Sequence, residues 1–148
     1  MKTLSQSLEQ TSELAQSFIA GIAPKQDSAT VVGLFGDLGA GKTTFTKACA
    51  EALGISETVA SPTFVIEKIY ATPLRLRGTS KFDQLIHIDA YRLEGGEELI
   101  KLGWKEVIEN PKNLVLIEWP EKVSEALPND MMKLYFKFID EKTREITI

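Results

Sequence analysis

Two short apolar runs of this sequence end in a carboxylate. The run "LIHIDA" carries Asp89 near its end, and "NLVLIEW" carries Glu118 in the same way. Ligands of open α/β sheets bind beyond the C-terminal ends of the strands, where such acids can serve a metal ion. One acid could hold the metal while the other orients an attacking water. Alternatively, each acid could cap a helix or pair with Arg92.

A third stretch supplies the ligand that these acids could serve. The stretch "GDLGAGKT" (36–43) fits the pattern G-x-x-x-x-G-K-[ST] and lies between an apolar run and a helical pattern. Its glycines permit positive φ, which turns backbone N–H groups toward phosphate oxygens. Lys42 can reach the β- and γ-phosphates, and the Thr43 hydroxyl can bind Mg²⁺. The predicted nucleotide-binding residues are Gly36, Asp37, Leu38, Gly39, Ala40, Gly41, Lys42, Thr43 and Thr44.

Alternating helical and strand patterns surround these motifs. Apolar spacing predicts helices over 7–22, 42–53 and 96–109, and strands over 30–35, 63–70, 84–90 and 113–119. The last two apolar runs, at 133–140 and 143–148, predict a hairpin at a sheet edge. The pattern indicates an α/β protein of the P-loop NTPase-like type. We expect a mixed, mostly parallel sheet flanked by helices, with a C-terminal antiparallel hairpin.

Length and composition fit one soluble domain over 1–148. The chain has 148 residues, 43% of them hydrophobic and 26% charged, which is typical of globular proteins. No apolar run is long enough for a membrane helix, and the N-terminus lacks the apolar core of a secretory signal. Cys49 is the only cysteine and falls at an apolar helical position, so we expect a buried thiol. These features predict a cytoplasmic protein.

The charge balance bears on nucleic-acid binding. A net charge of −4 argues against a protein that mainly coats nucleic acid. The stretch 67–82 is locally basic, with Lys68, Arg75, Arg77 and Lys81 opposed by Glu67. Its loop, 71–83, is either a solvated connection or a contact surface for tRNA or an acidic partner.

Two further positions are candidates near the phosphate site. In "SPTF" (61–64), Thr63 leads from a loop into a strand and could sense the γ-phosphate through the metal, as switch loops do. A simple turn explains the same spacing. His87 is the only histidine and alternates with Asp89 on one face of its strand. It is either a hydrogen-bonded structural residue or a contact near the site.

The motifs together resemble one family. The stretches "GDLGAGKTT", "SPTF", "HIDAYRL", "EEL" and "IEWPE" occur in the order and spacing of the bacterial P-loop ATPase of tRNA threonylcarbamoyladenosine biosynthesis, the TsaE family. The resemblance covers nearly the whole chain. It implies an ATPase that supports turnover by partner proteins, which transfer threonylcarbamoyl to position 37 of tRNA. It also implies ATP at 36–44.

The resemblance implies roles for individual residues as well. Thr43 and Glu118 would serve Mg²⁺, and Asp89 would be essential for activity and lie near the metal. Thr63 would lie in a switch-like loop, and Trp119 would lie beside the metal site. Together with Lys42, the predicted catalytic residues are Asp89, Glu118 and Thr63. Family members often read "HFDLYRL", so Ile88 and Ala90 are departures that remove no chemical group. The loop at 71–83 is longer and more basic than is usual.

Two other functions fit the same motifs. A small-molecule or nucleoside kinase would use Asp89 as a base and Arg92 on the acceptor, but the chain has little length for an acceptor lid. A nucleotide-binding partner without catalysis would tolerate loss of both acids. A GTPase is disfavoured because the sequence contains no N-K-x-D motif. We expect hydrolysis by the isolated chain to be weak.

Overall fold

A single mixed sheet forms the centre of the computed structural model, which describes residues 1–60, 66–73 and 81–148. Within those residues the sheet has seven strands in the order β1-β7-β6-β2-β5-β4-β3. The strands are β1 (Lys2–Ser5), β2 (Thr30–Phe35), β3 (Glu67–Ala71), β4 (Gln84–Asp89), β5 (Asn113–Glu118), β6 (Met132–Phe138) and β7 (Arg144–Thr147).

The middle of the sheet is parallel. Strand β2 pairs in parallel with β5 and β6, and β5 pairs in parallel with β4. Strands β3, β7 and β1 add antiparallel pairs on the two sides. The register sets Leu34 opposite Glu118, and Glu118 opposite Asp89. Both acids therefore lie at the C-terminal ends of their strands, on the side of the sheet where β2 leads into the glycine-rich loop. The predicted mixed sheet is confirmed, with its parallel part in the middle.

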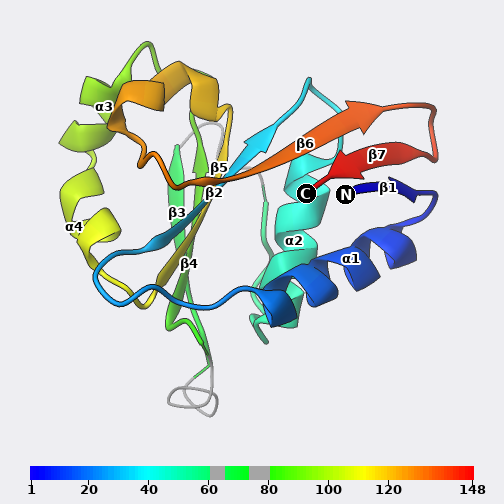
Figure 1. Cartoon of the computed structure of the whole chain (residues 1–148), viewed down its shortest axis with the longest axis horizontal. Coiled ribbons are helices and arrows are strands. Elements are labelled where there is room, and N and C mark those ends of the chain that lie inside the picture. Colours follow the sequence, from blue (N-terminus) through cyan, green and yellow to red (C-terminus); the bar gives the residue numbers. More distant parts are fainter. Residues whose placement is uncertain (61–65, 74–80) are drawn as a thin grey trace.

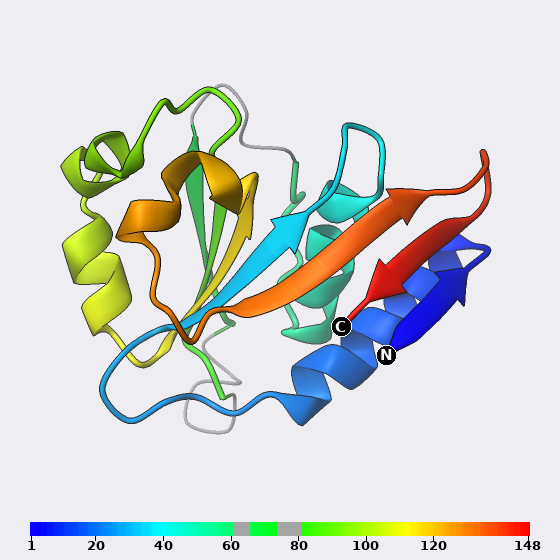
Figure 2. The same ribbon diagram turned by 45° about the horizontal axis from the view of Figure 1, so that its top comes forward.

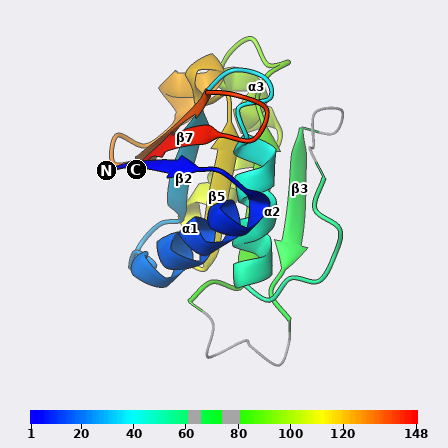
Figure 3. The ribbon, with the colours of Figure 1, turned by 90° about the vertical axis from the view of Figure 1, so that its right-hand side faces the viewer.

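Helices cover both faces of this central sheet (Figure 1). On one face, α1 (Leu8–Gly21) and α2 (Lys42–Ala52) lie side by side (Figure 3). On the other face lie α3 (Gly96–Lys101), α4 (Trp104–Glu109) and the 3₁₀ helix η2 (Pro120–Ala126). The side chain of Ser7 caps α1 by accepting the N–H of Gln10 at 3.1 Å. The predicted 7–22 and 42–53 helices are thus confirmed.

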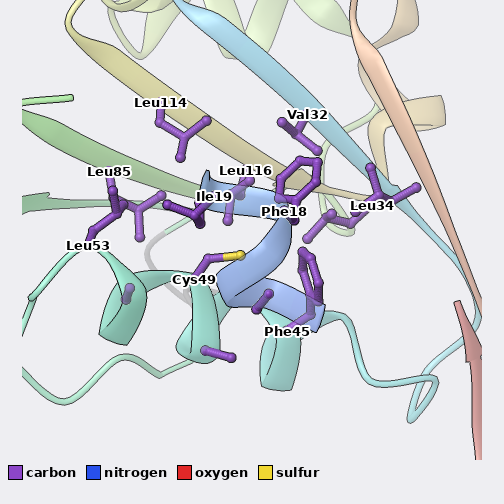
Figure 4. Close-up of a cluster of buried hydrophobic side chains, with 14 of the residues drawn as sticks. Phe18, Ile19, Val32, Leu34, Phe45, Cys49, Leu53, Leu85, Leu114 and Leu116 are labelled. Atoms are coloured by element: carbon purple, nitrogen blue, oxygen red, sulfur yellow. The ribbon is translucent and has the colours of Figure 1, made fainter. Parts of the chain in front are cut away.

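The larger core lies between the sheet and the α1–α2 pair. Phe18 from α1 and Phe45 from α2 pack with their ring centres 5.7 Å apart, among the leucines and valines of β2, β4 and β5 (Figure 4). Cys49 is fully buried in this core, where desolvation raises the pKa of its thiol. The buried thiol predicted from the sequence is confirmed. Because this core fixes α2 against β2, it also fixes the loop between them.

Two predictions about elements are wrong. The pattern at 96–109 predicted one helix, but Gly103 adopts a left-handed φ of 87° and separates α3 from α4. The C-terminal hairpin is present, yet it does not form the edge of the sheet, because β1 pairs with β7 outside it (Figure 2). Strand β1 has only four residues, three of them polar, and carries no periodic signal. The strand expected at 63–70 is described from Glu67 onward.

One lysine of the basic stretch at 67–82 binds another part of the same chain. Lys81 donates to the carbonyl oxygens of Ala20 and Ile22, at 2.6 and 2.8 Å, and so binds the C-terminal end of α1. Lys68 is exposed on β3, whereas Arg75 and Arg77 lie outside the described residues. In the part of the chain that is described, no helix is long and apolar enough to cross a membrane.

Candidate nucleotide and metal site

The glycine-rich loop has the backbone that its sequence predicts. Gly36, Gly39 and Gly41 all have positive φ, of 147°, 77° and 102°. At Gly36 the carbonyl oxygen of Phe136 on β6 leaves no space for a side chain. Gly41 is the N-cap of α2, with its carbonyl accepting the N–H of Phe45 at 3.0 Å. The first turn of α2 therefore opens toward the loop, as phosphate binding at a helix N-terminus requires.

Lys42 lies in the first turn of α2 and forms no ion pair with an acid of the described residues. Its ammonium group bonds to the carbonyl of Gly36 and lies 3.8 Å from the ring centre of Trp119. Burial lowers the pKa of Lys42, although Glu118, Glu121 and other acids oppose that effect. A cation at a helix N-terminus is also opposed by the helix dipole. A bound anion would remove both penalties.

Thr43 and Glu118 are joined directly. The Thr43 hydroxyl donates to the carboxylate of Glu118, with distances of 3.1 and 3.2 Å to its two oxygens. The same carboxylate lies 2.6 Å from Nε2 of His87, and both of these side chains are almost completely buried. The end of β5 is thus tied to the start of α2 and to β4.

Asp89 ends β4 beside Glu118. It is 5% exposed, and its Oδ1 accepts the backbone N–H of Tyr91 at 3.0 Å. Tyr91 in turn packs on Trp119, with ring centres 5.1 Å apart. Trp119 has a left-handed φ of 58°, unusual for a residue other than glycine, and η2 begins directly after it. This bend turns the indole ring back toward Lys42.

These groups border one cavity of about 560 Å³. Lys42, Thr43, Asp89 and Glu118 all line it, as does Trp119. The other lining residues come from three segments, namely Ser5, Gln6, Ser7, Leu8 and Thr11 near the N-terminus, Leu38, Gly39, Ala40, Gly41 and Thr44 of the loop and α2, and Glu141, Lys142, Arg144 and Ile146 of the C-terminal hairpin. The volume is in the range of small-molecule sites.

The hairpin contributes a residue that sequence reasoning missed. Nε of Arg144 donates to the carbonyl of Gly39 at 3.1 Å, and its side chain packs over Gly41. Its Nη1 donates to the carbonyl of Asp140 at 2.6 Å. Arg144 reaches the loop because β7 pairs with β6, and β6 pairs with β2, which leads into the loop. The sequence carries no signal for that strand order, so this contact could not be predicted.

The remaining predicted residues have different surroundings. Gly36 and Asp37 form the start of the loop, and the backbone carbonyl of Asp37 accepts the N–H of Ala40 at 3.1 Å. Neither is among the described residues that line the cavity, and nor is the exposed Arg92. Thr63, together with the rest of "SPTF", lies outside the described residues.

A glycine-rich loop between a central parallel strand and a helix defines a P-loop NTPase-like fold. The sequence model described as "Threonylcarbamoyl adenosine biosynthesis protein TsaE" matches residues 5–146 of this chain. The chain belongs to the TsaE family.

Individual relatives agree with that family match. The tRNA threonylcarbamoyladenosine biosynthesis protein TsaE of Bacillus subtilis (strain 168) is 38% identical over 139 residues, which cover 94% of this chain and 78% of that protein. The protein of the same description from Rickettsia bellii (strain RML369-C) is 34% identical over 147 residues, which cover 97% of this chain and 90% of its own. The crystal structure of YdiB from Bacillus subtilis is similar with a TM-score of 0.75 and 33% identity, covering 99% of this chain and 82% of that one.

Proposed function

We propose that this chain is the ATP-binding and Mg²⁺-dependent ATP-hydrolysing component of the machinery that makes threonylcarbamoyladenosine at position 37 of tRNA. Relatives in several bacteria are described by that biosynthesis, which supports the pathway. The observation that carries the nucleotide part is the cavity where α2 begins. There the loop, Lys42 and Thr43 meet the two acids that end β4 and β5.

The donors at this cavity suit a magnesium ion. The Thr43 hydroxyl and the carboxylates of Glu118 and Asp89 are hard oxygen donors, and Mg²⁺ is usually held by one or two carboxylates together with phosphate oxygens. Thr43 and Glu118 would hold the ion, with Asp89 close by. When bound, the ion neutralises charge on the β- and γ-phosphate oxygens.

The chain's own residues then have distinct tasks. Lys42 and the inward N–H groups of the loop hold the phosphates. Glu118, which accepts the Thr43 hydroxyl, belongs on the metal side of the site. Asp89 has no such tie to Thr43, and we assign it the attacking water, which it would orient and whose proton it would accept. ATP is the proposed nucleotide because the sequence has no N-K-x-D guanine motif.

Partner proteins carry out the rest of the proposed reaction. The threonylcarbamoyl transfer is assigned to partner proteins, and tRNA contacts this chain indirectly or through the loop at 71–83. The isolated chain would hydrolyse ATP slowly, and the full complex faster. Equal ATP turnover by the isolated chain and by the complex would contradict this dependence on partners.

Nucleotide binding tests the proposal directly. Loss of a charge-assisted hydrogen bond should weaken Mg-ATP binding about tenfold or more in Lys42→Met, measured by calorimetry. Lys47→Met is the matched control, because Lys47 is an exposed lysine of the same helix. Equal affinity of the two variants would overturn the site. Rapid phosphate transfer from ATP to nucleosides without partners would favour a kinase instead.

A further inference from the structure

His87 is a buried polar residue that the proposed mechanism does not use. It is the only histidine of the chain and is 0% exposed in the middle of β4. Its neighbours in register are Leu116 on β5 and Lys68 on β3, so strands flank it on both sides. An imidazole in such a place has a fixed orientation, because core packing leaves its ring no alternative rotamer.

The imidazole has one polar partner among the described residues. Nε2 lies 2.6 Å from Oε2 of Glu118, whereas the buried Nδ1 has no hydrogen-bond partner there. A proton on Nδ1 would leave a buried N–H unpaired, which is costly. The arrangement therefore assigns the ring proton to Nε2, which donates to the carboxylate.

Glu118 is thus held from two sides. His87 binds Oε2 from β4, and the Thr43 hydroxyl reaches both oxygens from the start of α2. Within the described residues, Oε1 accepts from Thr43 alone. A glutamate has three rotatable side-chain bonds, and without the imidazole it could turn away from the threonine. With the imidazole, its free lone pairs stay beside the hydroxyl that faces the phosphate site.

We infer that His87 is a positioning residue, which fixes the Glu118 carboxylate beside Thr43 so that the two are ready for magnesium before the nucleotide arrives. The inference rests on the proposed function, since it names the residue that prepares the metal side of that site. A purely structural His87 would stabilise the fold without any specific effect on magnesium. The two roles differ in what substitution does to the magnesium dependence of nucleotide binding.

The experiment compares ATP affinity with Mg²⁺ and with EDTA. His87→Phe keeps an aromatic ring but loses the donor, and His87→Gln keeps an N–H donor at a similar distance along the side chain. Loss of a hydrogen bond to a metal ligand typically costs 10–100-fold, so in His87→Phe the gain in affinity from Mg²⁺ should fall about tenfold or more. Affinity in EDTA should stay at the wild-type level, and His87→Gln should recover much of the gain.

Leu85→Val is the control for a destabilised strand. Leu85 is fully buried on β4, and strand alternation puts it on the same face as His87. It is not among the described residues that line the cavity. It should lower the melting temperature and leave the magnesium gain intact. An unchanged magnesium gain in His87→Phe overturns the inference. If His87→Phe loses ATP affinity equally in EDTA and in Mg²⁺, the inference is also overturned, because a purely structural role of His87 predicts that equal loss.

A second measurement needs no substitution at His87. Because the chain has one histidine, nitrogen NMR of histidine-labelled protein reports this ring alone. We expect a protonated Nε2 whose signal shifts with Mg-ATP and in Glu118→Gln. A ring signal that is the same in wild type and Glu118→Gln overturns the inference. If the wild-type chain gains no ATP affinity from Mg²⁺, the proposed function itself fails. If the wild-type chain gains affinity and His87→Phe gains as much, only the inference about His87 fails.

Discussion

At the scale of single residues, Glu118 and Asp89 end adjacent strands but have different partners. Glu118 accepts from Thr43, the residue after the P-loop lysine, and lies against His87. Asp89 accepts the N–H of Tyr91, two residues further along its own chain. These contacts are the basis for assigning Glu118 to the metal and Asp89 to the water.

That assignment predicts that substitutions of Asp89 and Glu118 differ in their effect on the magnesium dependence of ATP binding. Asp89→Asn and Glu118→Gln should both bind ATP, because Lys42 and the loop are unchanged. Each should slow partner-stimulated hydrolysis about 100-fold or more, the usual contribution of an acid–base group. Only Glu118→Gln should lose the magnesium dependence of binding. Titration of ATP affinity against Mg²⁺ separates the variants, and a loss confined to Asp89→Asn would reverse the roles.

Single residues of the loop were predictable because backbone sterics restrict them. Positive φ at Gly36, Gly39 and Gly41 follows from the motif, and the structure has it at all three. The left-handed φ of Trp119 was not predictable, because its sequence gives no sign of a glycine-like backbone. The contact between Arg144 and Gly39 was missed as well, since it depends on strand order.

At the scale of elements, Gly103 divides a helical pattern into α3 and α4. An added Cβ there would meet the Glu106 carboxylate only at 3.5 Å, so the cost of substitution is conformational. Gly103→Ala should destabilise the fold by about 1–2 kcal/mol, the cost of a left-handed residue with a side chain. Denaturant unfolding measures this free energy.

Gly21 provides the matched comparison for that prediction. It is the last residue of α1, and an added Cβ would meet no atom within 4 Å. Gly21→Ala should stabilise the protein by up to about 1 kcal/mol, because alanine loses less conformational freedom in a helix. Similar effects of the two substitutions on the free energy of unfolding would refute the conformational explanation.

The turn between β6 and β7 depends on Asp140. Its Oδ1 accepts the N–H groups of Lys142 and Thr143, both at 2.9 Å, and these bonds hold its pKa below the ordinary 3.8. A lowered folded-state pKa stabilises the fold above the ordinary value, and this contribution is lost as pH falls through the lowered one. Wild type should therefore melt higher than Asp140→Asn near neutral pH, with a difference that shrinks below pH 3.8. Melting curves at several pH values measure it, and a constant difference would exclude the linkage.

Prediction of elements succeeded where one pattern dominates. Strand β2 matches its predicted bounds, and α2 and β5 match within a residue, because each joins a strong apolar pattern to a clear stop. Strand β1 was not predicted, because it forms a strand by pairing with β7 at the other end of the chain. Local sequence cannot indicate a pairing between residues so far apart.

At the scale of the whole molecule, the cavity is built from both ends of the chain. The N-terminal amino group donates to the carbonyl of Ile148 at 2.6 Å, and the adjoining strands bring the start of α1 and the β6–β7 turn to the P-loop. The termini lie side by side in Figure 1. Under the proposed function, partner proteins that bind this end of the sheet would contact the segments that line the nucleotide cavity.

Repeated formation of threonylcarbamoyladenosine on tRNA tests the proposed ATPase role of this chain most directly. The assay contains the partner proteins, ATP and Mg²⁺, with either wild-type chain or Glu118→Gln. We predict continued product formation with wild type. Glu118→Gln should bind ATP and hydrolyse it about 100-fold more slowly, so product should nearly stop after a burst that matches the amount of complex. Continued formation at the wild-type rate with Glu118→Gln would contradict an ATPase role for this chain.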